Sequence, residues 1–118
     1  MLRLTREEFS GPTLRRPGRF TVCFYAEWCP YSREFLEVFV AHEPQATVPL
    51  ALADLSDQSD LRWELFGIEV VPTLIGFQDG RIVWRLDGSL GVGLLREDLA
   101  HAEEKWAEVR PSRPTASA

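Results

Sequence analysis

The chain has 118 residues, of which 45% are hydrophobic, and its formal net charge at pH 7 is −5. The apolar content argues against a disordered chain and favours one domain with a modest core, while the acidic balance argues against nucleic-acid binding, which needs a concentrated basic face. No apolar run approaches the roughly 18 residues of a membrane span, so we expect no membrane contact. The N-terminus lacks the apolar core of a signal peptide, and two cysteines do not make a disulfide scaffold. We therefore expect a reducing, cytoplasmic setting.

The first half of the chain predicts alternating strands and helices. Residues 2–5 form a short strand candidate, and Thr5 with Glu8 fits a capping box for a helix after it. The apolar, aromatic run 20–26 predicts a buried strand. Residues 48–53 are apolar on both faces, which is typical of a parallel strand covered by helices.

A further helix is predicted directly after Cys29. Pro30 suits the first turn, because its missing N–H would have no partner there. Apolar residues then recur at helical spacing: Phe35, Leu36, Phe39 and Val40. The pattern predicts that this helix ends before Pro44.

The second half of the chain predicts a short helix and a hairpin. Residues 60–66 indicate a helix that ends at Gly67. Residues 73–77 and 81–86 predict two strands, and the turn sequence Gln-Asp-Gly between them is typical of a hairpin.

A last helix and a tail complete the predicted organisation. Apolar residues between positions 95 and 109 step by four and three, which predicts an amphipathic helix. Residues 111–118 are rich in Pro, Ser and Ala and are expected to be a disordered tail, so the domain is assigned to residues 1–110. Parallel strands followed by a hairpin predict an α/β domain with a mixed sheet.

Cys29 stands where a buried strand ends and a helix begins. The free N–H groups and the macrodipole at a helix N-terminus favour a thiolate over a thiol. Three residues further on, where redox motifs of this kind carry a second cysteine, the chain has Ser32. Its spacing places Ser32 on the same face of the helix, from where we expect its hydroxyl to donate a hydrogen bond to the thiolate.

Three separate pieces of the chain resemble the thioredoxin family, in order and at matching distances. Residues 24–30, Phe-Tyr-Ala-Glu-Trp-Cys-Pro, resemble the family's strand and active-site turn. Residues 66–74 resemble its proline loop, and residues 77–81 resemble its hairpin, which is followed by Gly88 and the last helix. The resemblance covers residues 2–109 and implies a thioredoxin-like three-layer fold, in which a central mixed sheet has helices on both faces.

The resemblance also implies a site. Cys29 would attack a substrate disulfide, Pro72 would be cis and face Cys29, and the backbone of Val71 would pair with an extended substrate. From the residues alone, the position of Pro72 just ahead of Thr73 also allows a trans turn at the start of a strand, but the family resemblance favours cis. The implied substrate-binding residues are Trp28, Pro30, Tyr31, Val71, Pro72 and Gly88, and the implied catalytic residues are Cys29 and Ser32.

Among the departures of the chain from the family, two bear on the chemistry of the site. Ser32 cannot resolve a mixed disulfide, because a hydroxyl is not a nucleophile toward sulfur under these conditions. Cys23 occupies the position of the family's buried aspartate, which serves the resolving thiol. Cys23 is either a small buried hydrophobic residue or an alternative resolving thiol, if the geometry of a bridge to Cys29 allows it.

These observations predict a thiol–disulfide exchange enzyme with a single nucleophilic cysteine. Its partner would be a disulfide-bearing or glutathionylated protein, and an external thiol such as glutathione would release it. No metal or other cofactor is expected, and the chain would be a monomer or a Cys29-linked dimer. Three alternatives stay open: an engineered Ser32 in a dithiol oxidoreductase, a binding module without turnover, and a glutaredoxin-like protein that holds an iron–sulfur cluster with glutathione.

Overall fold

In the computed structural model, which describes residues 1–111, five strands form a central mixed sheet. In spatial order they are β1 (Leu2–Leu4), β5 (Leu50–Asp54), β4 (Arg19–Tyr25), β6 (Thr73–Gln78) and β7 (Arg81–Leu86). β1, β5 and β4 run parallel, whereas β6 and β7 are antiparallel to their neighbours. The predicted mixed sheet is therefore confirmed.

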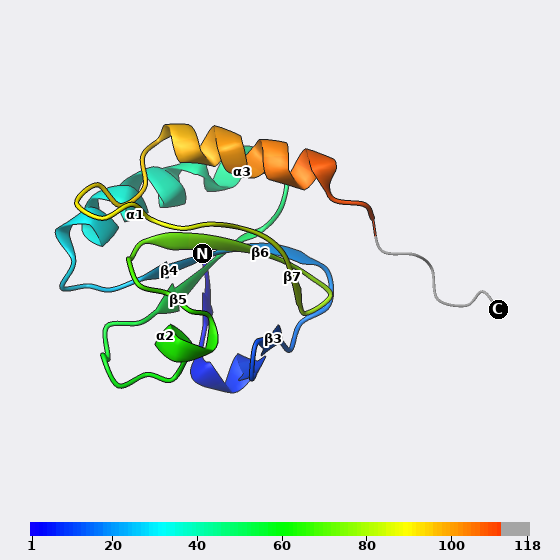
Figure 1. The fold of residues 1–118 in the computed structure, drawn as a ribbon. Coiled ribbons are helices and arrows are strands. Elements are labelled where there is room, and N and C mark those ends of the chain that lie inside the picture. The colour runs from blue at the N-terminus through cyan, green and yellow to red at the C-terminus, as the bar shows by residue number, and fades with distance from the viewer. Residues whose placement is uncertain (112–118) are drawn as a thin grey trace.

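Helices cover both faces of this sheet (Figure 1). α1 (Pro30–His42) and α3 (Glu97–Glu108) lie together on one face, and α2 (Arg62–Leu65) lies on the other. A single 3-10 turn, η2 (Glu43–Gln45), follows α1. The arrangement is the three-layer α/β fold expected from the sequence. No helix among residues 1–111 is long and apolar enough to cross a membrane.

The strand β4 is buried on both faces because its side chains alternate between two cores. Val22 and Phe24 pack into the core on the α2 side. Cys23 and Tyr25 point the other way, into the core between the sheet and the helices α1 and α3. This two-sided burial explains why the strand reads as a continuous apolar run.

The prediction of a helix after residue 5 is wrong. Only one 3-10 turn forms, η1 (Arg6–Glu8), in which the Glu8 carboxylate accepts a hydrogen bond from the Thr5 N–H at 3.1 Å. The chain then turns through Gly11, at φ +57°, into a small antiparallel pair, β2 (Phe9–Ser10) and β3 (Thr13–Leu14). The physical reason is tertiary, since the extended backbone at Phe9 buries its ring against other aromatic rings of the core.

The remaining predicted elements are confirmed, with ends that differ by one or two residues. The turn between β6 and β7 has Asp79 at φ +50° and Gly80 at φ +87°, as a two-residue hairpin requires. The predicted tail, apart from Pro111, lies outside the described residues.

A buried ion pair fixes the loop that leads into α2. Arg62 donates hydrogen bonds to both carboxylate oxygens of Asp60, at 3.0 and 2.9 Å, and to the carbonyl oxygen of Asp54 at 2.9 Å. The guanidinium lies 5.5 Å from the ring centroid of Phe9. Burial alone would raise the pKa of Asp60, but the hydrogen bonds from Arg62 outweigh it and lower that pKa.

Replacing Asp60 tests this pair. Asp60→Asn leaves the buried Arg62 charge without its counter-charge, so we expect the free energy of unfolding to fall by about 3 kcal/mol at neutral pH. Because the folded pKa of Asp60 is lowered, the pair stabilises the protein above the unfolded value of about 4, and this stabilisation is lost as the pH falls through the folded pKa.

Urea unfolding of the two proteins at neutral pH and at about pH 3 measures this difference. The difference in the free energy of unfolding between wild type and Asp60→Asn should be smaller at the lower pH. A gap of the same size at both pH values would contradict the assigned role of the ion pair.

Candidate active site

Cys29 lies at the N-terminus of α1, as predicted. Its backbone is extended, at φ −93° and ψ +118°, and Pro30 is the first helical residue. The Cys29 carbonyl oxygen accepts the hydrogen bond of the Arg33 N–H at 3.1 Å, which begins the helical pattern. The Cys29 residue is 8% exposed, so only an edge of it reaches the surface.

The Cys29 thiol faces the proline loop. Its Sγ donates a hydrogen bond to the Val71 carbonyl oxygen at 3.5 Å, and the peptide bond between Val71 and Pro72 is cis. A thiolate cannot donate, so ionisation ends this hydrogen bond. Cys29 is the N-cap residue of α1, although its sulfur makes no capping hydrogen bond to the N–H groups of the first helical turn.

The predicted hydrogen bond from Ser32 to Cys29 is not among the hydrogen bonds of residues 1–111. Ser32 is fully buried, and its Oγ accepts a hydrogen bond from the Ala26 N–H at 3.2 Å. Ala26 follows the last residue of β4, so its N–H lies beyond the ladder and needs another acceptor. Ser32 thus ties the first turn of α1 to the end of the central strand.

Cys23 lies in a different environment from Cys29. It is completely buried in the core with Tyr25 and Phe35, whereas Cys29 packs with the core on the opposite face of the sheet. Burial raises the pKa of the Cys23 thiol far above its usual value, so Cys23 stays protonated. Both cysteines are free. This separation argues against Cys23 as a resolving thiol.

The turn before Cys29 is braced by the loop after β5. The Trp28 indole N–H donates to the Ser56 carbonyl oxygen at 2.8 Å, and the Trp28 ring stacks on Trp63 with centroids 6.2 Å apart. The Ser56 hydroxyl accepts the Glu27 N–H at 2.8 Å, while the Ser56 N–H donates to the Asp54 carboxylate at 2.8 Å. These contacts hold Trp28, which is 49% exposed, beside the cysteine.

Sequence reasoning missed the roles of Ser56 and Trp63 in this brace. Trp63 had only the general signal of a packing aromatic residue, and Ser56 had none. Both lie far along the chain from Trp28, so no spacing rule links them.

Two glycines let the loop after β7 pack against the proline loop. A Cβ on Gly88 would lie 2.3 Å from the Pro72 carbonyl oxygen. A Cβ on Gly93, at φ +72°, would lie 2.8 Å from Tyr31 Cβ and 3.0 Å from Pro72 Cδ. Gly88 therefore packs against Pro72, and Gly93 packs beside Pro72 and Tyr31. In the sequence, the only signal for Gly93 was its glycine-rich context.

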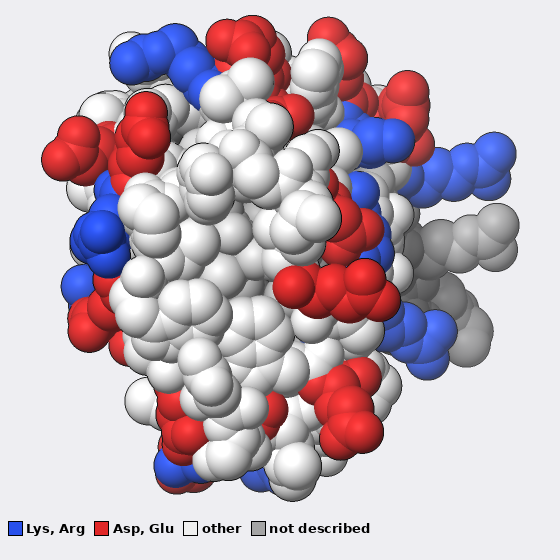
Figure 2. All heavy atoms as spheres, turned by 60° about the vertical axis from the view of Figure 1, so that its left-hand side comes forward, with Lys and Arg blue, Asp and Glu red and all other residues white. Residues whose placement is uncertain are grey.

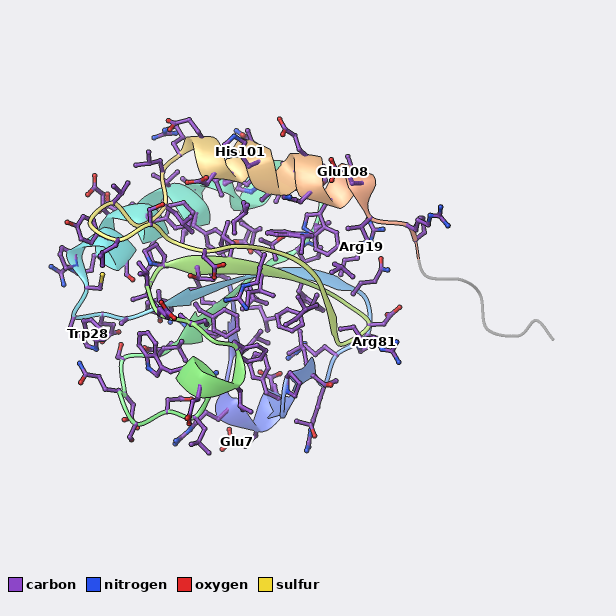
Figure 3. The ribbon with its side chains drawn as sticks, in the orientation of Figure 1. Glu7, Arg19, Trp28, Arg81, His101 and Glu108 are labelled. Carbon is purple, nitrogen blue, oxygen red and sulfur yellow. The ribbon has the colours of Figure 1, made fainter. Side chains whose placement is uncertain are left out.

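The surface around Cys29 is apolar. Figure 2 shows a broad uncharged area on this side of the molecule, with acidic and basic side chains around its margin. Trp28 and Tyr31 are exposed from the turn and from α1, and the loop after β7 adds further exposed apolar side chains: Leu90, Val92 and Leu95. Contiguous exposed apolar side chains are a common feature of protein interaction sites. In Figure 3, Trp28 lies at one end of the molecule, far from Arg81 and Glu108.

Comparison with known proteins agrees with this geometry. The family model described as Thioredoxin matches residues 1–101, and the chain belongs to the thioredoxin family, a family of thiol–disulfide oxidoreductase type.

Two solved thioredoxin structures show the same fold. The crystal structure of Chlamydomonas reinhardtii thioredoxin f2 superposes with a TM-score of 0.72 at 16% identity, covering 93% of this chain and 99% of that one. The reduced Schistosoma mansoni thioredoxin pre-protein superposes with a TM-score of 0.62 at 19% identity, covering 75% and 79%.

The different burial of the two cysteines predicts selective labelling. In the folded protein at about pH 8, iodoacetamide should modify Cys29 at least about a hundredfold faster than Cys23, because Cys23 is inaccessible and protonated. Peptide mass spectrometry after timed quenching measures both rates. Protein unfolded in guanidinium is the control, and there both cysteines should react at similar rates. Comparable rates in the folded protein would show that the Cys23 core opens readily.

Proposed function

We propose that this protein is a thiol–disulfide exchange enzyme that works through Cys29 alone and is released by an external thiol such as glutathione. The observation that carries the proposal is the position of Cys29, the one cysteine of the chain with an exposed edge, at the start of α1 and against the Val71 carbonyl. Position 32, one helical turn on, carries a buried serine that is engaged with Ala26.

The proposed cycle has two exchange steps. The Cys29 thiolate attacks one sulfur of a glutathionylated partner, so a Cys29–glutathione disulfide forms and the partner leaves as a thiolate. A second glutathione thiolate then attacks this disulfide. Glutathione disulfide leaves and the Cys29 thiolate is restored, so each turn consumes one free glutathione: its sulfur loses one electron and the partner sulfur gains one, while the glutathione that came with the partner leaves in the glutathione disulfide.

The surrounding residues would hold the partner in this cycle. Trp28, Pro30 and Tyr31 present an exposed face on one side of the sulfur. Val71 and Pro72 lie on the other side, with Gly88 packed on the Pro72 carbonyl. An extended partner segment would pair with the Val71 backbone, as the family resemblance implies. A reducing compartment such as the cytoplasm would keep Cys29 reduced, either as a monomer or recoverable from a Cys29-linked dimer.

Turnover with a defined substrate tests the proposal. The full chain should reduce a glutathionylated peptide in the presence of excess glutathione, with glutathione disulfide measured by a coupled reductase. Cys29→Ser should lower the rate to the uncatalysed background, because the attacking sulfur is gone. Cys23→Ala is the matched control and should keep most of the activity. A wild-type rate equal to the background would end the enzyme proposal.

A second variant pair tests the missing resolving thiol. Ser32→Cys adds a thiol one turn from Cys29, so the mixed disulfide with a peptide should decay without external thiol, whereas in the wild type it should persist. Ser32→Ala is the control, since it loses the hydrogen bond from Ala26 and adds no thiol. It should cost about 1 kcal/mol of stability and leave the mixed disulfide persistent. Intact-mass spectrometry measures the lifetimes, and rapid decay in the wild type would contradict the single-cysteine cycle.

A binding module without turnover is the second candidate. Its support is the low exposure of Cys29, at 8%, within a broad uncharged face. In that case Cys29→Ala would leave the affinity for a captured partner unchanged, whereas the exchange enzyme would lose its covalent complex.

A further inference from the structure

A groove lies between α1 and the loop that follows β7. Its volume is about 510 Å³. Tyr31 and Val38 line it from α1, and Val92 and Leu95 line it from the loop. Three of these side chains are substantially exposed: Tyr31 at 40%, Val92 at 45% and Leu95 at 49%. The groove therefore offers room and uncovered apolar surface for a side chain from another molecule.

The groove is continuous with the site. Tyr31 belongs to both, since it lies two residues after Cys29 and lines the groove. Gly93 packs against both Tyr31 and the ring of Pro72. Because Gly93 has no side chain, nothing at this position projects between the proline loop and the groove. An extended chain advances about 3.4 Å per residue. A segment with its sulfur at Cys29 would thus enter the groove within a few residues.

The charges of the groove favour a basic occupant. Glu34 from α1 and Glu97 from the start of α3 line it, both exposed, against one basic residue, Arg96. The net charge of the chain is −5. Two carboxylates against one guanidinium make the groove itself acidic, so it favours a cationic segment over an acidic one and disfavours a second copy of this acidic groove.

We propose that this acidic groove, formed by Tyr31, Glu34, Val38, Val92, Leu95 and Glu97, binds the partner segment beside the reactive disulfide, and that this segment carries an apolar side chain next to Lys or Arg. The inference rests on the proposed function, because it names the class of partner that Cys29 attacks. The apolar side chain fills the groove, and the cation pairs with Glu34 and Glu97.

Three synthetic peptides test the groove. Each carries one cysteine in a mixed disulfide with a chromogenic aromatic thiol, followed by Leu-Lys, Leu-Glu or Ser-Lys. The rate constant for release of the aromatic thiol is measured with the full chain and divided by the rate constant with 2-mercaptoethanol, an uncharged thiol. This ratio removes differences in the intrinsic reactivity of the peptides.

The wild type should prefer Leu-Lys over Leu-Glu by about threefold to tenfold at low salt, and high salt should reduce the preference. It should also prefer Leu-Lys over Ser-Lys by a similar factor, because leucine buries more apolar surface. The double variant Glu34→Lys/Glu97→Lys should lose or reverse the charge preference. Glu104→Lys/Glu108→Lys makes the same change in net charge elsewhere on α3, and it should keep the wild-type preference.

The possible outcomes separate the two proposals. If the wild type exchanges with all peptides without a charge preference, the proposed role of the groove is wrong and the exchange chemistry stands. The same conclusion follows if both double variants lose the preference equally. Self-association of the reduced wild type that Glu34→Lys/Glu97→Lys alters would assign the groove to a second copy, which also overturns it.

If the wild type exchanges with none of the peptides, the proposed function fails and binding still tests the groove. Fluorescent versions of the peptides with serine in place of cysteine are then titrated with Cys29→Ala. Tighter binding of Leu-Lys that disappears with Glu34→Lys/Glu97→Lys supports the groove. Equal binding of Leu-Lys and Leu-Glu overturns it.

Discussion

The strand β4 is paired along both edges, and this pairing decides which parts of the chain meet at Cys29. Its register sets Tyr25 opposite Asp54 on β5 and Phe24 opposite Thr73 on β6. The loop that follows β5 and the cis peptide that precedes β6 therefore converge at the end of β4, where Cys29 begins α1. Loops at the carboxyl ends of parallel strands are the usual place for a site in α/β proteins.

Hydrogen bonds of side chains other than that of Cys29 hold this arrangement. Arg62 fixes the Asp54 carbonyl, Ser56 carries the restraint to Trp28, and Ser32 binds the Ala26 N–H. The cysteine is thus presented from a braced turn. In the core between the sheet and the helices α1 and α3, Cys23 remains a neutral thiol, so the chain avoids the cost of a buried carboxylate. The absence of such an acid is consistent with the absence of a thiol that would need it.

The sequence predicted the features that depend on local pattern. The buried strands, the helix after Pro30 and the hairpin at Asp79 follow from periodicity and turn chemistry, which act over a few residues. The features it did not predict depend on contacts between distant segments. A 3-10 turn forms in place of the predicted helix because Phe9 packs into the core. Ser32 accepts a hydrogen bond from the Ala26 N–H, at the end of β4, instead of donating one to Cys29. The brace through Ser56 is of the same kind, because its partners lie 28 and 29 residues away.

The central claim is that the fold presents Cys29 as the reactive thiol of the chain. The most direct measurement is the rate of alkylation by iodoacetamide at neutral pH, made on the Cys23→Ala chain and on a peptide spanning residues 26–33. The peptide lacks the folded helix N-terminus, where free N–H groups favour the reactive form of a thiol, so the folded chain should react faster than the peptide. A folded chain that reacts at the same rate or more slowly would contradict the claim.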